Sequence, residues 1–264
     1  LDKLNIYHVG LKHKKLKDFK GIWKIYYFFW RIIFEISFVL GASRILKMNR
    51  FDVINAQSPI TTSLPCSLFG RKFFITAHGV HHEGFGKLYK TQGNFFVLNI
   101  GGFFYKMIEK FNIKRANKVI CLGKSTYDYY KNFNKCTIIP NGIDVSRFSC
   151  HNKRRGKEII SIGRFTEQKA IDKLIVAMDG LKDYNLSIIG LGPLEKDIRA
   201  LCKTRKNCKF LGYKTQEEIP KYLCNSRFTV MPSLFEGLPI SMLEAMSCGV
   251  IPITTAVGDI PSLI

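Results

Sequence analysis

The chain has 264 residues, of which 46% are hydrophobic, and this is enough to build one large or two medium globular domains. Its formal net charge is +21, and residues 1–150 carry most of it, with 24 Lys and Arg against 8 Asp and Glu. The composition excludes an intrinsically disordered chain, and the basic first half favours a polyanionic surface, either anionic lipid or nucleic acid.

Short apolar segments bounded by turn residues alternate with helical segments, which predicts βαβ units and parallel sheets. The expected strands are residues 5–9, 52–55, 73–76, 118–121 and 137–139, then 158–162, 186–189, 208–211, 228–231 and 250–254. Between the two series, residues 149–157 are polar and basic and are expected to be a linker. We therefore expect two doubly wound α/β domains, residues 1–148 and 158–264, that face each other across a cleft.

Residues 22–40 form the most hydrophobic segment, but Lys24, Arg31 and Glu35 interrupt it. These charges argue against a transmembrane span. An ordinary helix that faces the core is the first interpretation, and a helix that leaves an exposed face at a lipid surface is the alternative.

The cysteines and histidines give no sign of a metal site. The eight cysteines are scattered without a C-x2-C pair, and the six histidines lack the spacing of metal ligands. Buried, reduced thiols in a cytosolic protein are therefore expected, rather than a metal cluster or a disulfide framework.

Residues 233–249 are the most informative segment, because Glu236 and Glu244 lie on either side of a Gly-Leu-Pro step. Pro239 is expected as the first helical residue, and Gly249 as the left-handed residue that ends the helix. Both carboxylates would then face the space in front of the helix. Unpaired N–H groups and the positive end of the helix dipole favour an anion there, so the segment predicts a sugar-nucleotide site.

Two cations follow an expected strand, Arg164 and Lys169. Cleavage of a sugar–phosphate bond leaves a nucleoside diphosphate with growing negative charge, which a divalent metal or fixed cations must neutralise. The sequence contains no Asp-x-Asp motif that would hold such a metal. We therefore expect the two side chains to do this without a metal or another cofactor.

Residues 233–249 resemble the E-x7-E motif of the retaining glycosyltransferases of family 4, which have the GT-B fold. Other segments resemble the family in the same order along the chain, namely residues 51–55, 75–79, 119–123, 138–144, 161–169, 188–193 and 210–213. The resemblance extends from about residue 51 to the end. It implies a fragment truncated at both ends, because the glycine-rich first turn and the last elements of the family are missing.

The resemblance also implies roles for the residues of the segment. Glu236 is expected to bind hydroxyl groups of the donor sugar near its anomeric carbon, and Glu244 to bind the ribose. The amides of Gly237 and Leu238 complete the site for the sugar and phosphate. Outside the segment, Ala170 stands where the family usually has glycine.

Further residues are assigned in the same way. Arg164 and Lys169 match the positions that stabilise the leaving diphosphate, and Gly163 allows its close approach. His78 resembles the histidine that contacts the donor sugar, and Leu211 lies in the segment that lines the base.

The implied function is a retaining, metal-independent transfer of a hexose from a nucleotide-diphosphate sugar to a glycan or lipid-linked acceptor, in the synthesis of cell-surface polysaccharide. The enzyme is expected in the cytoplasm, with peripheral binding to the anionic inner face of the membrane. Two alternatives stay open: a glycoside hydrolase that uses Glu236 and Glu244 as its carboxylate pair, and a basic nucleic-acid-binding protein. Hydrolysis does not require Arg164 and Lys169, and no nucleic-acid-binding motif is visible, so no nucleic acid is expected as a partner.

Overall fold

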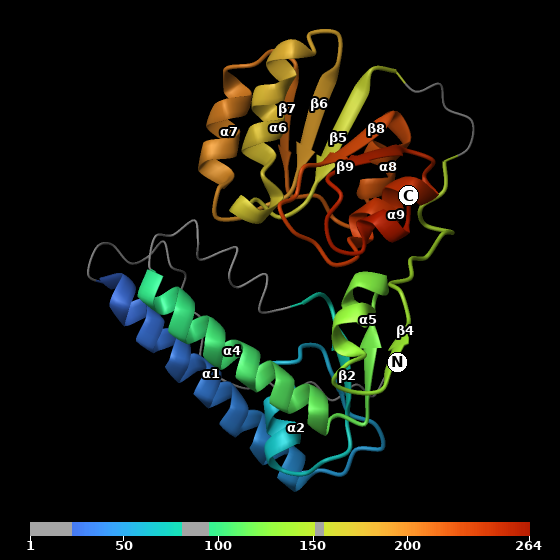
Figure 1. Ribbon diagram of the computed structural model, residues 1–264. Helices are drawn as coiled ribbons and strands as arrows, with labels where there is room; N and C mark the ends of the chain where they lie inside the picture. The colour runs from blue at the N-terminus through green and yellow to red at the C-terminus, as the bar shows by residue number, and fades with distance from the viewer. Residues whose placement is uncertain (1–22, 81–94, 151–155) are drawn as a thin grey trace. The chain divides into compact units, whose positions relative to one another are not determined.

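The computed structural model describes residues 23–80, 95–150 and 156–264 (Figure 1). Contacts divide the chain into unit 1, made of Leu1–Cys121 and Thr126–Ile138, and unit 2, made of Leu122–Ser125 and Ile139–Ile264. The segment 139–150, which the sequence analysis assigns to the first domain and the start of the linker, is therefore part of unit 2. The expected strand 5–9 lies outside the described residues.

Unit 1 contains a parallel sheet with the strand order β1-β2-β3-β4. The strands are β1 (Asn55–Ala56), β2 (Phe74–Ala77), β3 (Lys118–Cys121) and β4 (Cys136–Ile138), and the helices are α1 (Trp23–Met48), α2 (Leu64–Leu68), α4 (Phe95–Arg115) and α5 (Lys124–Tyr130). Phe73, directly before β2, and Ile75 and Ala77 within it are almost fully buried, whereas Phe74 at the start of the strand is exposed. These buried residues pack with Ile113 of α4 in the core of the unit.

None of the helices in the described part of the chain combines the length and the hydropathy that crossing a bilayer requires.

Unit 2 contains a second parallel sheet, in the order β7-β6-β5-β8-β9. Its strands are β5 (Glu158–Ile162), β6 (Asn185–Ile189), β7 (Cys208–Gly212), β8 (Phe228–Met231) and β9 (Ile251–Thr254), and its α-helices are α6 (Ile171–Ala177), α7 (Glu195–Lys203), α8 (Ile219–Asn225) and α9 (Ile240–Ser247). Three short 3₁₀ turns complete the described part of the unit, η2 (Glu167–Lys169), η3 (Met178–Gly180) and η4 (Ile260–Ser262).

The sheet of unit 2 is covered on both faces, with α6 and α7 on one and α8 and α9 on the other (Figure 1). Neighbouring residues of a strand point to opposite faces. Accordingly, Ile159 packs in the cluster that includes α6 and α7, whereas Ile160 packs with α8 and α9. The continuous apolar runs of these strands reflect burial on both sides, as is usual for parallel sheets.

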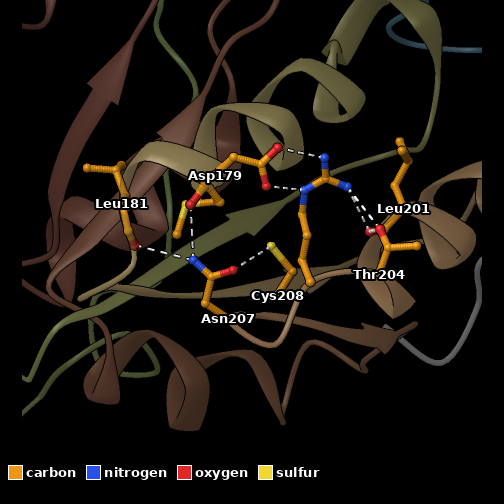
Figure 2. A network of polar contacts seen from close by, with 8 residues as sticks. Asp179, Leu181, Leu201, Thr204, Asn207 and Cys208 are labelled. Carbon is orange, nitrogen blue, oxygen red and sulfur yellow. Dashed lines mark hydrogen bonds and ion pairs between the residues drawn. The ribbon is translucent and has the colours of Figure 1, made fainter.

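A polar network joins the end of α7 to η3 (Figure 2). Arg205 binds both carboxylate oxygens of Asp179, at 2.8 Å each, and this pairing lowers the pKa of Asp179. Asn207 donates to the carbonyl oxygens of Met178 at 3.1 Å and Leu181 at 3.3 Å. These contacts fix the turns at the amino end of the sheet, away from the loops that follow β5 and β8.

The expected strands 118–121, 158–162 and 228–231 coincide with β3, β5 and β8. The expectation of reduced thiols was wrong for one pair, because Cys150 and Cys224 form a disulfide. The two residues are 74 positions apart, so no local spacing marks them.

Candidate active site

The predicted site residues of unit 2 follow two adjacent strands, β5 and β8. From β5 the chain builds the sheet in one direction through β6 and β7, and β8 and β9 extend it in the other direction. A doubly wound sheet has a crevice at such a reversal, outside the carboxyl ends of the strands. The segment 163–169 follows β5 and the segment 232–239 follows β8, so both lie where ligands of this architecture bind.

Lys169 and Glu236 form an ion pair across these two segments. The Lys169 Nζ atom lies 2.5 Å from the Glu236 Oε1 atom, and the side chains are 20% and 8% exposed. Lys169 is the last residue of η2, and Ala170 then takes up a left-handed conformation with a φ of 46°. This conformation is unfavourable for a residue with a Cβ atom, so the turn that places Lys169 is strained at Ala170, where the family usually has glycine.

The two segments are also joined by backbone contacts beside the ion pair. The amide of Leu234 donates to the carbonyl oxygen of Gln168 at 2.8 Å, and the Gln168 side chain donates to the carbonyl oxygen of Phe235 at 2.8 Å. A Cβ atom at Gly258 would lie 2.0 Å from the carbonyl oxygen of Glu236. The backbone around Glu236 is therefore held from two sides.

The loops after β5 and β6 are packed too closely for side chains at two glycines. A Cβ atom at Gly190 would lie 1.9 Å from the carbonyl oxygen of Gly163, and one at Gly192 would lie 2.4 Å from that of Phe165. At Gly163 the same atom would lie 3.7 Å from Lys169 Cε, an ordinary contact. Gly190 and Gly192 therefore allow the close backbone packing behind the site, and the role of Gly163 toward a ligand stays a prediction.

Arg164 is exposed, and no ion pair joins it to another residue of the described ranges. It lies between Gly163 and the buried Phe165, directly after β5. Its guanidinium group is therefore available to an anion from solvent, whereas the ammonium group of Lys169 already has a partner in Glu236.

Glu244 lies in α9, and its residue is only 6% exposed. The Gln216 side chain donates a hydrogen bond of 2.6 Å to its Oε1 atom. Burial raises the pKa of Glu244, and the positive charge of Arg147 opposes this rise. The carboxylate is therefore desolvated and ready to accept further hydrogen bonds.

The structure corrects one detail of this helix, since Pro239 is the residue before its first turn and Ile240 is the first helical residue. Gly249 follows the helix with a φ of 67°, as expected for a left-handed ending. Leu238 is buried, and its carbonyl oxygen accepts a hydrogen bond of 2.9 Å from Asn141. The carbonyl oxygen of Gly237 accepts one of 3.2 Å from the Asp259 amide.

His78 belongs to unit 1 and follows β2 directly. One nitrogen of its ring, Nε2, lies 2.8 Å from the Gln57 Oε1 atom. Desolvation lowers the pKa of His78, which favours the neutral form of the ring. Its relation to the residues of unit 2 stays a prediction.

Leu211 lies on β7 and lines a pocket of about 420 Å³ together with Ser187 and Tyr222. The pocket also includes the first residues of β5 and β6, Glu158 and Asn185. The contact between Leu211 and the base of a nucleotide stays a prediction. Gln168, Gln216 and Asn141 support the site but were missed, because a single amide side chain in a loop has no distinctive spacing.

Two family descriptions match the chain. Glycosyltransferase Family 4 matches residues 13–147, just over half of the chain, and Glycosyl transferases group 1 matches residues 143–264. The two matches meet near residue 145, close to the start of unit 2 at Ile139.

Among curated relatives, UDP-Gal:alpha-D-GlcNAc-diphosphoundecaprenol alpha-1,3-galactosyltransferase of Escherichia coli is 27% identical over 83% of the chain. The chain spans 61% of that protein's length. The putative colanic acid biosynthesis glycosyltransferase WcaL of Escherichia coli is 29% identical over 49% of the chain and 36% of its own length.

Solved structures share the architecture at low identity. Sucrose-phosphate synthase from Thermosynechococcus elongatus has a TM-score of 0.68 and 20% identity, covering 84% of this chain and 60% of its own. WaaG, a glycosyltransferase involved in lipopolysaccharide biosynthesis, has a TM-score of 0.66 and 16% identity, covering 88% of this chain and 67% of its own. The expected GT-B fold is confirmed.

Proposed function

Because the chain belongs to Glycosyltransferase Family 4, whose model matches residues 13–147, we propose that it is the greater part of a retaining enzyme that transfers a hexose from a nucleotide-diphosphate sugar. The acceptor is a glycan or lipid-linked glycan of cell-surface polysaccharide synthesis. The observation that carries the proposal is the Lys169–Glu236 pair at the point where the sheet of unit 2 reverses.

The residues around this pair suit the parts of a sugar nucleotide. Lys169 and Arg164 supply two positive charges directly after β5, where the departing diphosphate gains negative charge. Glu236 supplies a carboxylate at the same place, and hydroxyl groups of the donor sugar are suitable donors to it. In this scheme sugar binding gives Glu236 new partners, and the charge of Lys169 becomes available to the diphosphate.

Glu244 completes the donor site at the ribose. Its desolvated carboxylate accepts one hydrogen bond from Gln216 and can accept further hydrogen bonds from hydroxyl groups. A ribose supplies two adjacent hydroxyl groups that can donate such hydrogen bonds. The hydrogen bond from Gln216 holds the Glu244 carboxylate in place before the ribose binds.

The lipid-linked acceptor has separate support from the relatives. The name of the relative in Escherichia coli describes transfer of galactose from UDP-Gal to a GlcNAc linked to diphosphoundecaprenol. This relative aligns over 83% of the chain, so an undecaprenol-linked acceptor is the first to test.

We expect transfer by the full-length enzyme to survive EDTA, because two side-chain cations face the diphosphate. The assay follows the release of nucleoside diphosphate and of glycosylated acceptor, and the anomeric configuration of the product by NMR. Loss of transfer in EDTA with rescue by Mg²⁺ or Mn²⁺ would contradict the assignment of Lys169 and Arg164. Hydrolysis of simple glycosides without nucleotide release would instead favour the alternative of a glycoside hydrolase that uses Glu236 and Glu244.

We further propose that unit 1 binds an anionic membrane surface. On α4 the side chains of Phe103, Met107 and Phe111 are exposed at a spacing of four, so they form one stripe. Lys106, Lys110 and Lys114 are spaced in the same way beside it. The opposite face of the helix is buried through residues such as Glu109 and Ile113.

The described part of α1 has a similar face. Ile33, Ile36 and Leu40 are 49%, 53% and 65% exposed, and Arg44 and Lys47 continue the same face toward the end of the helix. Apolar side chains bordered by lysine and arginine are the pattern of helices that lie in a membrane interface. This supports the alternative interpretation of residues 22–40 and adds α4, which the sequence analysis did not single out.

Co-sedimentation of the full-length protein with vesicles tests this second proposal. We expect binding to anionic vesicles that falls with salt, and a loss of about fivefold for each of Lys106→Ala and Lys114→Ala, since a basic residue near an anionic leaflet contributes about 1 kcal/mol. Phe103→Glu should also weaken binding, whereas Val176→Glu, at an exposed position on α6 of unit 2, is the matched control. Equal binding to neutral and anionic vesicles would contradict the proposal.

A further inference from the structure

Three cysteines from distant parts of the chain meet in unit 2. Cys150 precedes the segment 151–155, Cys224 lies on α8, and Cys248 directly follows α9. Their sulfur atoms all lie within 4.8 Å of one another. The cluster is at the end of α9 that is farther from Glu236, one helical turn beyond Glu244, and none of its three cysteines belongs to the predicted donor site.

The surrounding chain holds the three cysteines together. Phe148 is 2% exposed and packs in one core cluster with Cys224 and Cys248. The Ser247 hydroxyl donates a hydrogen bond of 2.8 Å to the Phe148 carbonyl oxygen. Residues 148–150 are thereby fixed against α8 and α9, and the Cα atoms of Cys150 and Cys224 lie 5.5 Å apart, within the range that a disulfide requires.

We propose that this cluster is a thiol oxidation site, at which a low-molecular-weight disulfide oxidises Cys150 and Cys224 and Cys248 serves as a third, exchanging thiol. Cys150 is partly exposed, whereas Cys224 and Cys248 are buried, so Cys150 carries the sulfur that a small molecule reaches first. Reactivity of a thiol depends on such access as well as on its ionisation.

The reaction balances as two exchange steps. The Cys150 thiolate attacks one sulfur of the small disulfide, forms a mixed disulfide and releases one thiolate. The Cys224 thiolate then attacks the Cys150 sulfur, forms the bond seen in the structure and releases the second thiolate. The protein pair loses two electrons, the small disulfide gains them, and the two cysteine protons pass to the released thiols.

Cys248 gives the site a second pairing without any further oxidant. Its thiolate can attack the Cys224 sulfur, which forms a Cys224–Cys248 bond and releases Cys150 as a thiolate. Three thiolates could also bind a soft metal ion such as Zn²⁺. The bonded pair in the structure favours oxidation over this second use.

The test is peptide mapping of the full-length protein after equilibration with glutathione disulfide or with dithiothreitol, followed by alkylation and mass spectrometry without reduction. In the oxidised wild-type protein we expect a Cys150–Cys224 linked peptide and, from the exchange step, a Cys224–Cys248 linked peptide, and we expect neither after dithiothreitol. The Cys150→Ser variant, which lacks the accessible sulfur, should form neither link. Cys202→Ser, which removes a buried cysteine of the same unit, is the matched control and should keep the Cys150–Cys224 link.

A second measurement is independent of the mapping. Oxidation should raise the melting temperature of the wild-type protein by about 10 °C, because the bond closes a long loop, and should leave that of Cys150→Ser unchanged. Absence of a linked peptide in folded, oxidised protein would overturn the proposal. So would stoichiometric Zn²⁺ in the purified reduced protein that prevents the link from forming, and oxidised wild-type protein without a Cys224–Cys248 linked peptide would overturn the role of Cys248.

Discussion

Lys169→Ala is expected to lower the rate of hexose transfer by about 10²–10³-fold, equivalent to about 2.7–4 kcal/mol, the usual loss when one charge-stabilising group is removed from an active site. The loss should be in kcat more than in KM, because the negative charge on the diphosphate grows as the sugar–phosphate bond breaks. Steady-state kinetics of the full-length enzyme, with release of nucleoside diphosphate as the signal, measure both constants.

The same substitution should also destabilise the unliganded protein. It leaves the Glu236 carboxylate, which is only 8% exposed, without its partner at 2.5 Å. A buried group that loses its partner costs about 1–3 kcal/mol of unfolding free energy. Lys173→Ala is the matched control, because Lys173 lies four residues further along the chain and is exposed.

Arg164→Ala separates the two effects. Arg164 is exposed and has no ion-pair partner in the described part of the chain, so its loss should leave the unfolding free energy close to that of the wild type. Its effect on the rate should still be comparable to that of Lys169→Ala. Rates near wild type in both variants would contradict the assignment of these cations to the leaving group.

The sequence predicted the elements of unit 2 well, because short apolar segments and the turn residues that bound them are local signals. The strands at 158–162 and 228–231 needed no correction, and Glu236 was placed correctly in the loop before α9. The resemblance to the family indicated Lys169 and Glu236, which lie in two loops that only the folded sheet brings together.

What the sequence could not predict depends on contacts between distant residues. The pairing of Lys169 with Glu236 spans 67 positions, and nothing near either residue indicates that they touch. Gln216 reaches Glu244 over 28 positions, and the disulfide joins residues 74 apart. In each case the partners are brought together by the packing of α8 and α9 on the sheet and by the order of its strands. A local sequence pattern does not contain this information.

The backbone strain at Ala170 could not be predicted from the sequence either. Ala170 was noted only as a departure from the glycine that the family usually has. The structure shows that this position is left-handed and buried, so alanine is accepted there at the expense of strain. The ion pair and the hydrogen bonds of Gln168 are the contacts that hold the turn in this conformation.

Glu236→Gln is expected to reduce transfer about as strongly as Lys169→Ala, by about 10²–10³-fold, because the proposed scheme places the carboxylate beside the reacting carbon. Its effect on stability should be smaller than that of Lys169→Ala. The Lys169 side chain is 20% exposed and has a long, flexible stem, so its ammonium group can turn to water when the carboxylate is gone. Asp197→Asn, at an exposed position on α7, is the control for the loss of one negative charge.

The double variant Lys169→Ala with Glu236→Gln tests whether the two side chains act as a unit. Groups in direct contact are not additive, so the double variant should be little slower than either single variant. It should also be more stable than Lys169→Ala alone, because no charged group is then left buried without a partner. Denaturant unfolding and kinetics of the four proteins complete the cycle. If the two losses simply add in both measurements, the pair does not form in solution, and the arrangement of the donor site around it is wrong.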